Sequence, residues 1–406
     1  MFLKQRYQAT GSLSNLAWRR LMKNRLAVAS MILIIISCLI ALLGYLITPD
    51  KTPFSNEQNL ALTTKKPGFR VQMLYVRKNE DAVKHNIFST MISGRKSDYT
   101  AVPVTAYRMT DSTIIVREYE GEGVAGVQSV FSLADVVYAL YGKPVYDRET
   151  GSFRFTTPEK AVVVVKAGDL KNEILEKNLK SKTFLLGTDR FGRDVLSQLM
   201  IGARVSLSVG CISVLISLLI GIFMGAIAGY FAGAVDAVIM WIINVIWSVP
   251  TLLLVIVITF TLGKGFWQVF IAVGLTMWVE VARVVRGQFM SLREKEFVEA
   301  GKALGFSNFR IIFRHILPNA MAPVIVISAA NFASAILLES GLSFLGIGVQ
   351  PPMPSWGTMI RENYAYIILD YAYLAILPGI AIMLMVLAFM LLGNALRDAL
   401  DVKTIG

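Results

Sequence analysis

The stretch EFVEAGKALGFSNFRIIFRHILPN, residues 296–319, contains two helical patterns joined at a glycine. The first pattern places small and apolar residues on one helical face, namely Phe297, Ala300, Gly301 and Leu304. Gly305 follows at the point where a residue in the left-handed conformation typically ends a helix. Ser307 or Asn308 can then cap the second helix, because their side-chain oxygens accept hydrogen bonds from free N–H groups.

The second pattern carries large apolar residues at helical spacing, namely Phe309, Ile312, Phe313 and Ile316. We expect Pro318 to break this helix and Pro323 to lie in the first turn of the next one, where a missing N–H group costs little. The pattern alone leaves two interpretations open. One is a helix pair that lies on lipid headgroups, and the other is a docking site for a partner protein.

The composition places this pair in a membrane protein. The chain has 406 residues, of which 55% are hydrophobic and 17% charged, whereas soluble domains have about 45–50% apolar and about 25% charged residues. The net charge is +12, but the basic residues cluster beside apolar runs, which argues against a nucleic-acid partner.

Few residues are candidates for redox or metal chemistry. Cys38 and Cys211 both lie inside apolar runs, so we expect them to be small core residues rather than redox groups or a disulfide. His85 and His315 stand without other ligand residues at metal-binding spacing, so no metal site is expected.

Six apolar stretches are long enough to cross a bilayer, which needs about 20 residues of helix. They are Leu26–Ile47, Val205–Gly229, Ala237–Leu262, Phe266–Val285, Ala320–Leu338 and Tyr373–Leu392. Basic residues gather in the N-terminal tail and between the fourth and fifth stretches. With six spans these segments fall on one side, which predicts a multi-pass protein of the cytoplasmic (inner) membrane with both termini cytoplasmic.

The predicted domains are a basic tail with the first span (1–47), an extracytoplasmic insert (48–182) and a five-helix core (183–406) with a cytoplasmic loop at 286–318. Within the insert, FRVQMLYV, STIIVREY and AVVVV are typical of strands, and YDRETGSFRF is typical of a hairpin. SLADVVYALYG and DLKNEILEKNL have helical spacing that runs to Leu140 and Leu179. We therefore expect a small α+β domain, although its sequence shows no cluster typical of a binding site.

Charged residues inside spans are candidates for function by default. Glu280 has Arg283 three residues later, and we expect a local ion pair between them. Glu339 is expected at the outer boundary of the fifth span, and Asp236 at the N-terminus of the third, where the helix dipole favours an acid.

Small residues and prolines predict how the spans pack. Three glycines of the second span, Gly221, Gly225 and Gly229, form small-x-x-x-small repeats that allow close helix contact. That contact could lie within this chain or with a second membrane-spanning protein. Pro250 and Pro378 are expected to kink the third and sixth spans.

Glu299-Ala300-Gly301, Gly305 and Leu317-Pro318 together resemble the EAA loop of ABC importer permeases. Gly301 stands where that family usually has a second alanine. His315 stands where the general motif has an aliphatic residue, but a basic RHILPN ending is usual in the peptide-permease branch. We therefore interpret His315 as a surface residue.

Three further segments are similar to the second, C-type permease of dipeptide, oligopeptide and nickel importers. They are LGTDRFGRDVLSQLMIGARVSLSVG, SGLSFLGIGVQPPMPSWGTMI and LLGNALRDALD. The resemblance covers residues of about 15–48 and 183–401. The chain departs from it in a much longer extracytoplasmic segment and in Val402, where a proline is typical.

The resemblance implies an all-α polytopic fold of the type I ABC importer permease, with about six transmembrane helices and the small α+β domain inserted between the first two. It also implies a second permease subunit, two ATP-binding subunits and an extracytoplasmic solute-binding protein. Glu299, Ala300 and Gly301 would contact an ATP-binding subunit, and Gly305 would set the angle between the two loop helices.

The expected function is peptide permeation driven by ATP hydrolysis in separate subunits. No Gly-x-x-x-x-Gly-Lys-[Ser/Thr] run occurs in the sequence, and no nucleophile–base arrangement is evident, so we expect neither an enzyme nor a cofactor in this chain. A permease for nickel or another small solute is the nearest alternative. An ion-coupled secondary transporter, which would show inverted repeats, and a membrane-anchored receptor are more distant ones.

Overall fold

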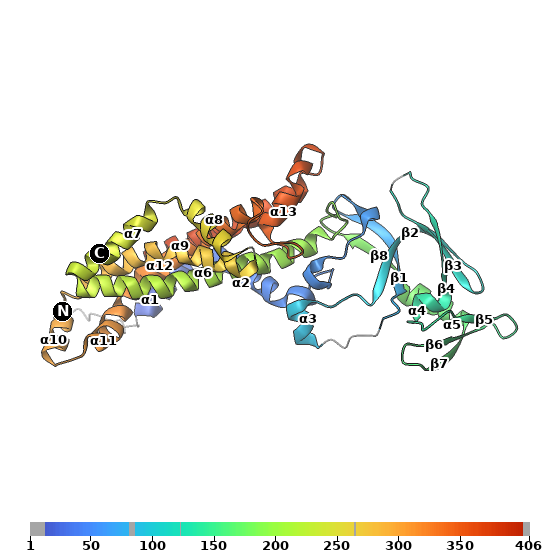
Figure 1. The fold of residues 1–406 in the computed structure, drawn as a ribbon, viewed down its shortest axis with the longest axis horizontal. Coiled ribbons are helices and arrows are strands. Elements are labelled where there is room, and N and C mark those ends of the chain that lie inside the picture. Colours follow the sequence, from blue (N-terminus) through green and yellow to red (C-terminus); the bar gives the residue numbers. More distant parts are fainter. Residues whose placement is uncertain (1–12, 81–85, 122, 264, 401–406) are drawn as a thin grey trace, which may run out of the picture. The chain divides into compact units, whose positions relative to one another are not determined.

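The computed structural model describes residues 13–80, 86–121, 123–263 and 265–400 (Figure 1). They form two compact units. The helical unit comprises the described residues up to Ala41, Gly202–Glu362 and those from Ala375 onward, and the sheet unit comprises Leu42–Ile201 and Asn363–Leu374.

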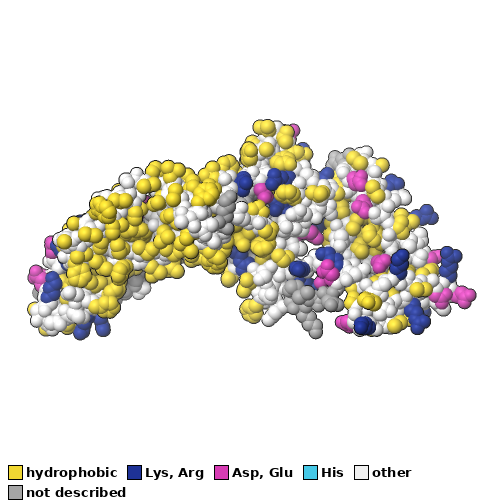
Figure 2. Space-filling model, viewed as in Figure 1, with side chains coloured by type: hydrophobic (Ala, Val, Ile, Leu, Met, Phe, Trp, Pro, Cys, Tyr) yellow, Lys and Arg dark blue, Asp and Glu magenta, His cyan; other side chains and the backbone are white. Residues whose placement is uncertain are grey.

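The helical unit consists of long apolar helices, because a backbone inside a bilayer must satisfy its own hydrogen bonds. The helices lying wholly or mostly in it are α1 (Leu13–Lys23), α2 (Arg25–Leu43), α6 (Val195–Phe231), α7 (Gly233–Trp247), α8 (Thr251–Leu262), α9 (Phe266–Leu292), α10 (Glu296–Ala303), α11 (Asn308–Arg310), the π-helical turn η5 (Ile311–Ile316), α12 (Leu317–Phe344), α13 (Trp356–Asn363) and α14 (Tyr373–Leu400). Figure 2 shows hydrophobic side chains over most of the visible face of this unit.

Among the described residues, five helical stretches are long and apolar enough to cross a membrane, and α7 with α8 makes a sixth if the two form one span. The kink expected at Pro250 in the third span, Ala237–Leu262, is present as a break between α7 and α8. Its two helices meet at an angle of 91°. Pro250 precedes α8 directly, and a proline disfavours helical backbone in the residue before it, which accounts for the break.

The two cysteines do not lie in a core. Cys38 and Cys211 are free and exposed on the surface of the chain, so their prediction as core residues is wrong. In a membrane-spanning helix an apolar run faces lipid as readily as it faces other helices, and hydrophobicity alone therefore does not indicate burial.

Helices α6 and α9 approach each other closely. The α6 face that packs against α9 carries the three glycines of the small-x-x-x-small repeats, Gly221, Gly225 and Gly229. A Cβ atom on Gly225 would lie 2.5 Å from the carbonyl oxygen of Ala282 and 2.8 Å from the Cβ atom of Val285. Hydrogen in place of a side chain therefore allows this contact, which lies within one chain.

The sheet unit contains every described strand. Its elements are η1 (Gly44–Leu46), η2 (Pro53–Ser55), η3 (Leu60–Leu62), β1 (Phe69–Arg77), α3 (Ile87–Ser93), β2 (Tyr99–Met109), β3 (Thr113–Glu118), β4 (Gln128–Ser132), α4 (Leu133–Val137), β5 (Val145–Asp147), β6 (Ser152–Thr156), β7 (Val162–Lys166), α5 (Ala167–Glu173), the π-helical turn η4 (Ile174–Asn178), β8 (Leu179–Phe184) and η6 (Tyr364–Ile368). The strands pair antiparallel in two sheets, of order β4-β3-β2-β1-β8 and β5-β6-β7.

Both faces of the larger sheet are covered. Successive residues of a strand point to opposite faces, and in β1 Leu74 belongs to one hydrophobic cluster while Val71 and Met73 belong to another. The first cluster joins the larger sheet to α4, α5 and the smaller sheet, with Phe153 and Leu170 fully buried. The predicted strands and hairpin are confirmed, and this is the small α+β region expected from the sequence.

Two predicted helices are too long. The helix expected to reach Leu140 ends at Val137, and Leu179 begins strand β8 rather than ending a helix. Asn178 accounts for the second change, because its side-chain nitrogen donates to the carbonyl oxygens of Tyr75 and Val136, at 2.7 and 3.0 Å. These bonds turn the chain into the sheet.

We predict that Gly225→Ala lowers the stability of the helical unit by about 1–3 kcal/mol, because the added methyl group overlaps the α9 backbone. Gly287→Ala is the matched control, since a Cβ atom there meets nothing within 4 Å and alanine favours a helix by about 1 kcal/mol over glycine. Thermal unfolding in detergent should show midpoints that move in opposite directions. Equal shifts would contradict the assigned packing.

Candidate functional site

Of the two short helices predicted for the loop between α9 and α12, the first forms as α10, whereas the second is continuous with α12. Helix α10 ends as expected at Gly305, whose φ of +75° is left-handed. Two hydrogen bonds close this end, from Gly305 N–H to the Lys302 carbonyl (2.9 Å) and from Phe306 N–H to the Gly301 carbonyl (3.0 Å). Ser307 caps the next helix by accepting from Arg310 N–H. We call residues 293–318 the coupling loop.

The predicted break at Pro318 is absent. Helical structure runs from Asn308 through the π-helical turn η5 into α12, which extends to Phe344. Proline in a helix normally clashes with the carbonyl group four residues earlier. Here Leu317 N–H donates to the carbonyl group of Ile312, five residues back, and this wider turn accommodates Pro318.

One side of the coupling loop is buried against the long helices. Val298, Ile311 and Ile316 are almost fully buried. They share a hydrophobic cluster with residues of α6, α9 and α12, among them Ala226, Val285, Phe289 and Val324. At the end of α6, Tyr230 donates its hydroxyl hydrogen to the side chain of Asn308 at 2.8 Å. The loop is therefore held by the bundle from which it projects.

The other side of the coupling loop is exposed and apolar. Its four large side chains have exposed fractions of 41–72%, and they are Phe297, Leu304, Phe309 and Phe313. Glu299 and Ala300 are also exposed, Leu317 is half-buried and Pro318 is exposed. Charged side chains gather at the end of the helical unit where α10 and α11 lie (Figure 2). We call this side the outer face of the loop.

Gly301 does not lie on the outer face. It is buried, and a Cβ atom there would lie 3.4 Å from Phe306 and 3.8 Å from Ile311. The four residues predicted to share one face therefore lie on two sides of the helix. Gly301 faces inward with Val298, whereas Phe297, Ala300 and Leu304 are exposed. His315 is half-buried and stacks on Phe306 at 5.5 Å, so its prediction as a surface residue is wrong.

A cavity of about 300 Å³ opens where α7 and α8 meet. Residues of α7, α8, α9 and α12 line it, among them Trp247, Thr251, Glu280 and Ser334. The predicted ion pair between Glu280 and Arg283 does not form. Arg283 instead donates to Asn244 at 2.9 Å and lies 3.6 Å above the ring of Trp247, which leaves the exposed carboxylate of Glu280 on the cavity wall.

Each of the other two acids of the spans has one partner that lies far away in the sequence. Asp236, in the first turn of α7 as predicted, pairs with Arg286 of α9 at 2.6 Å. Glu339 is fully buried. It accepts hydrogen bonds from the hydroxyl groups of Ser206 and Ser343, at 3.1 and 2.7 Å, and these donors compensate the buried carboxylate.

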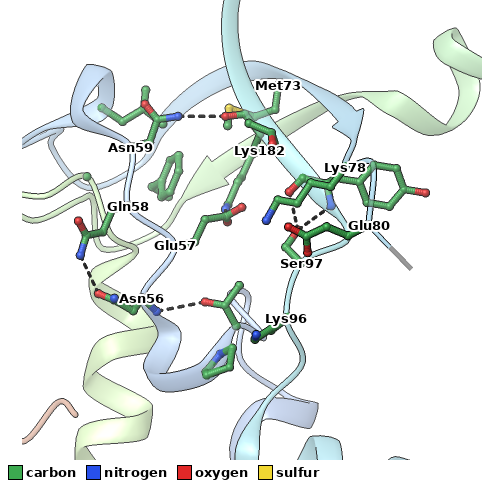
Figure 3. Close-up of a pocket in the computed structure, with 18 residues that line it drawn as sticks. Asn56, Glu57, Gln58, Asn59, Met73, Lys78, Glu80, Lys96, Ser97 and Lys182 are labelled. Atoms are coloured by element: carbon green, nitrogen blue, oxygen red, sulfur yellow. Dashed lines mark hydrogen bonds and ion pairs between the residues drawn. The ribbon is translucent and has the colours of Figure 1, made fainter. Parts of the chain in front are cut away.

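A polar cleft of about 450 Å³ lies in the sheet unit (Figure 3). Glu57 and Lys182 pair across it at 2.9 Å, and Lys78, Glu80 and Lys96 surround it. Burial lowers the pKa of Lys182, but the carboxylate of Glu57 outweighs this effect and holds that pKa above its ordinary value. Sequence reasoning missed the cleft because four distant segments build it, with no local motif.

Two family descriptions match the chain. "Binding-protein-dependent transport system inner membrane component" matches residues 218–406, and "N-terminal TM domain of oligopeptide transport permease C" matches residues 12–67. The strands that the structure describes lie between these two ranges. The chain belongs to the family of binding-protein-dependent inner-membrane permeases of ABC importers, which makes it a multi-pass transport protein with the type I permease fold.

Within that family the chain is similar to C-type peptide permeases. It is 43% identical over 217 residues to the dipeptide transport system permease protein DppC of Alkalihalophilus pseudofirmus, covering 53% of this chain and 71% of the relative. It is 40% identical over 223 residues to the glutathione transport system permease protein GsiD of Pectobacterium atrosepticum, covering 55% and 74%. An inward-facing structure of the MetNI methionine ABC transporter aligns with 16% identity and a TM-score of 0.43, covering 50% of this chain and 96% of that one.

We predict that Gly301→Leu and Ala300→Leu, which change neighbouring residues, have opposite consequences for folding. Leucine at 301 would overlap Phe306 and Ile311 and should destabilise the loop by about 1–3 kcal/mol. Leucine at 300 lies in solvent and should leave the stability of the isolated permease unchanged. Thermal unfolding and limited proteolysis at the loop would distinguish them, and equal protease sensitivity would contradict the assignment of the two faces.

Proposed function

We propose that this chain forms half of the translocation path of an ATP-driven importer of short peptides. The names of the similar permeases, which specify dipeptides and glutathione, support this substrate class. Its partners would be a second permease subunit, two ATP-binding subunits and an extracytoplasmic solute-binding protein. Both termini and the coupling loop would face the cytoplasm, as the basic segments favour.

The outer face of the coupling loop carries this proposal. Exposed phenylalanine and leucine side chains in a water-facing loop indicate a protein or membrane contact. The small exposed side chain of Ala300 allows a partner backbone to approach the loop closely. An ATP-binding subunit with an apolar groove fits this face, with Glu299 at its edge and Gly305 setting the angle between the two helices.

The buried side of the coupling loop, which we call its inner face, would transmit movement of the loop to the membrane-spanning helices. Because Val298 and Ile311 are packed against the ends of α9 and α12, a displacement of the loop displaces both helices. Closure of two ATP-binding subunits would thus tilt α9 and α12 together and favour one of two arrangements of the permease. Tyr230 and Arg286 connect the same movement to α6 and α7.

The cavity beside the broken helix pair would belong to the path. It lies between helices that this movement displaces, and its wall presents the carboxylate of Glu280 with hydroxyl groups of Thr251 and Ser334. An ionisable residue in a membrane-spanning segment is tolerated where it faces water or a partner. A water-filled path satisfies that requirement.

We predict that Phe309→Ser prevents copurification of the ATP-binding subunits while leaving permease folding unchanged, because this side chain is 72% exposed. Loss of an anchoring aromatic residue typically weakens binding by about 2 kcal/mol or more. Ile368→Ser, at an exposed site in η6, is the matched control and should copurify normally. Normal copurification and uptake in Phe309→Ser would reject the docking role.

The substrate class is tested with the complete transporter in proteoliposomes. We expect a labelled dipeptide to accumulate when ATP is supplied on the cytoplasmic side and the solute-binding protein on the extracytoplasmic side. Uptake of nickel without uptake of any peptide would favour the small-solute alternative. Uptake that persists without ATP but follows an ion gradient would instead favour a secondary transporter.

A further inference from the structure

Helix α3, Ile87–Ser93, exposes a cluster of large apolar side chains. The exposed fractions are 69% for Ile87, 70% for Phe88 and 62% for Ile92. With 3.6 residues per turn these three positions share one arc of the helix, while Ser89 and Ser93 fall on the adjoining arc. The helix is therefore amphipathic, although it belongs to the sheet unit.

Helix α3 contacts the end of the first candidate membrane span. It packs against η1 (Figure 1), and η1 is the last turn of the apolar stretch Arg25–Leu46 that forms the first membrane span. Tyr45 in η1 is buried, and its hydroxyl oxygen accepts from Phe54 N–H at 2.9 Å. Helix α3 therefore packs directly against the end of the first candidate span.

A second contact fixes the end of α3. Arg95 N–H donates to the carbonyl oxygen of Lys51 at 2.7 Å. Gly94, with a φ of +74°, lies so close to this segment that a Cβ atom would be 2.9 Å from the same oxygen. Residue 51 follows the span after a few residues. The contacts with η1 and with Lys51 therefore hold both ends of α3 beside the segment that follows the span.

The surroundings have the chemistry of a membrane interface. Apolar side chains continue from the span itself, where Leu42 and Ile47 are exposed by 59% and 44%. The side chains of Lys51 and Lys96 are exposed on the adjoining surface. Helices that lie in the plane of a bilayer combine such an apolar face with basic residues that reach lipid phosphates.

We propose that α3 is an in-plane membrane anchor of the sheet unit. Ile87, Phe88 and Ile92 insert below the lipid headgroups, and Lys51 and Lys96 contact the phosphates of anionic lipids. The anchor restrains the sheet unit at the membrane surface. This role is independent of the transported solute.

The size of the apolar cluster favours lipid over a protein partner. Stable protein interfaces bury about 800 Å² on each partner, which is more than three side chains on a seven-residue helix offer. A bilayer needs no such matching surface and is already in contact with the preceding span. Lipid is therefore the occupant to which the proposal commits.

The test uses the full chain reconstituted in vesicles of phosphatidylethanolamine and phosphatidylglycerol, with Cys38→Ala and Cys211→Ala as background. A nitroxide is attached at Phe88→Cys or, as the matched control, at the adjacent Ser89→Cys. Collision rates are measured with oxygen, which concentrates in the bilayer, and with a water-soluble nickel chelate. We expect the oxygen-to-nickel ratio to be several-fold higher at position 88.

Equal ratios at the two positions, or a higher nickel accessibility at position 88, would overturn the proposal. So would a label at 88 that is shielded from both reagents only when the solute-binding protein is added, because that result indicates a protein contact. Phe88→Trp and Ser89→Trp provide a second measurement that preserves an aromatic residue. Brominated lipids should quench the added fluorescence of the first variant more strongly, and equal quenching would count against the anchor.

Discussion

The close contact between α6 and α9 is the interaction on which the rest of the helical unit depends. Hydrogen in place of a side chain at Gly225 brings the two backbones together. At the end of this pair, Tyr230 of α6 reaches the coupling loop and accepts a hydrogen bond from Arg293 through its carbonyl oxygen. The ion pair between Asp236 and Arg286 adds α7 to the same end. A wider spacing of α6 and α9 would separate all of these groups.

The two faces of the coupling loop follow from this arrangement. The inner face is apolar because it completes the packing of α9 and α12, whereas the outer face is apolar although its large side chains remain 41–72% exposed. Packing explains the first face but gives no reason for the second. In the proposed function a partner protein supplies that reason, and the buried side would transmit its movement to the membrane-spanning helices.

The sequence predicted those features that depend on local periodicity or on backbone conformation. The apolar spans, the strands of the sheet unit and the left-handed Gly305 belong to this group. It did not predict features that depend on contacts distant in sequence, such as the hydrogen bond from Ser206 to the buried Glu339 or the polar cleft around Lys182. The prediction of a helix break at Pro318 was wrong for another reason. A local π-helical turn removes the clash that proline usually causes.

Photocrosslinking from the outer face of the coupling loop tests the central claim most directly. A benzophenone amino acid at Leu304, whose side chain is 72% exposed, would be activated in membranes that contain the complete transporter. The account predicts a crosslink to an ATP-binding subunit, and none from the same probe at Ile368. Crosslinks from Leu304 to lipid alone would show that the loop is an interfacial helix pair and would contradict the account.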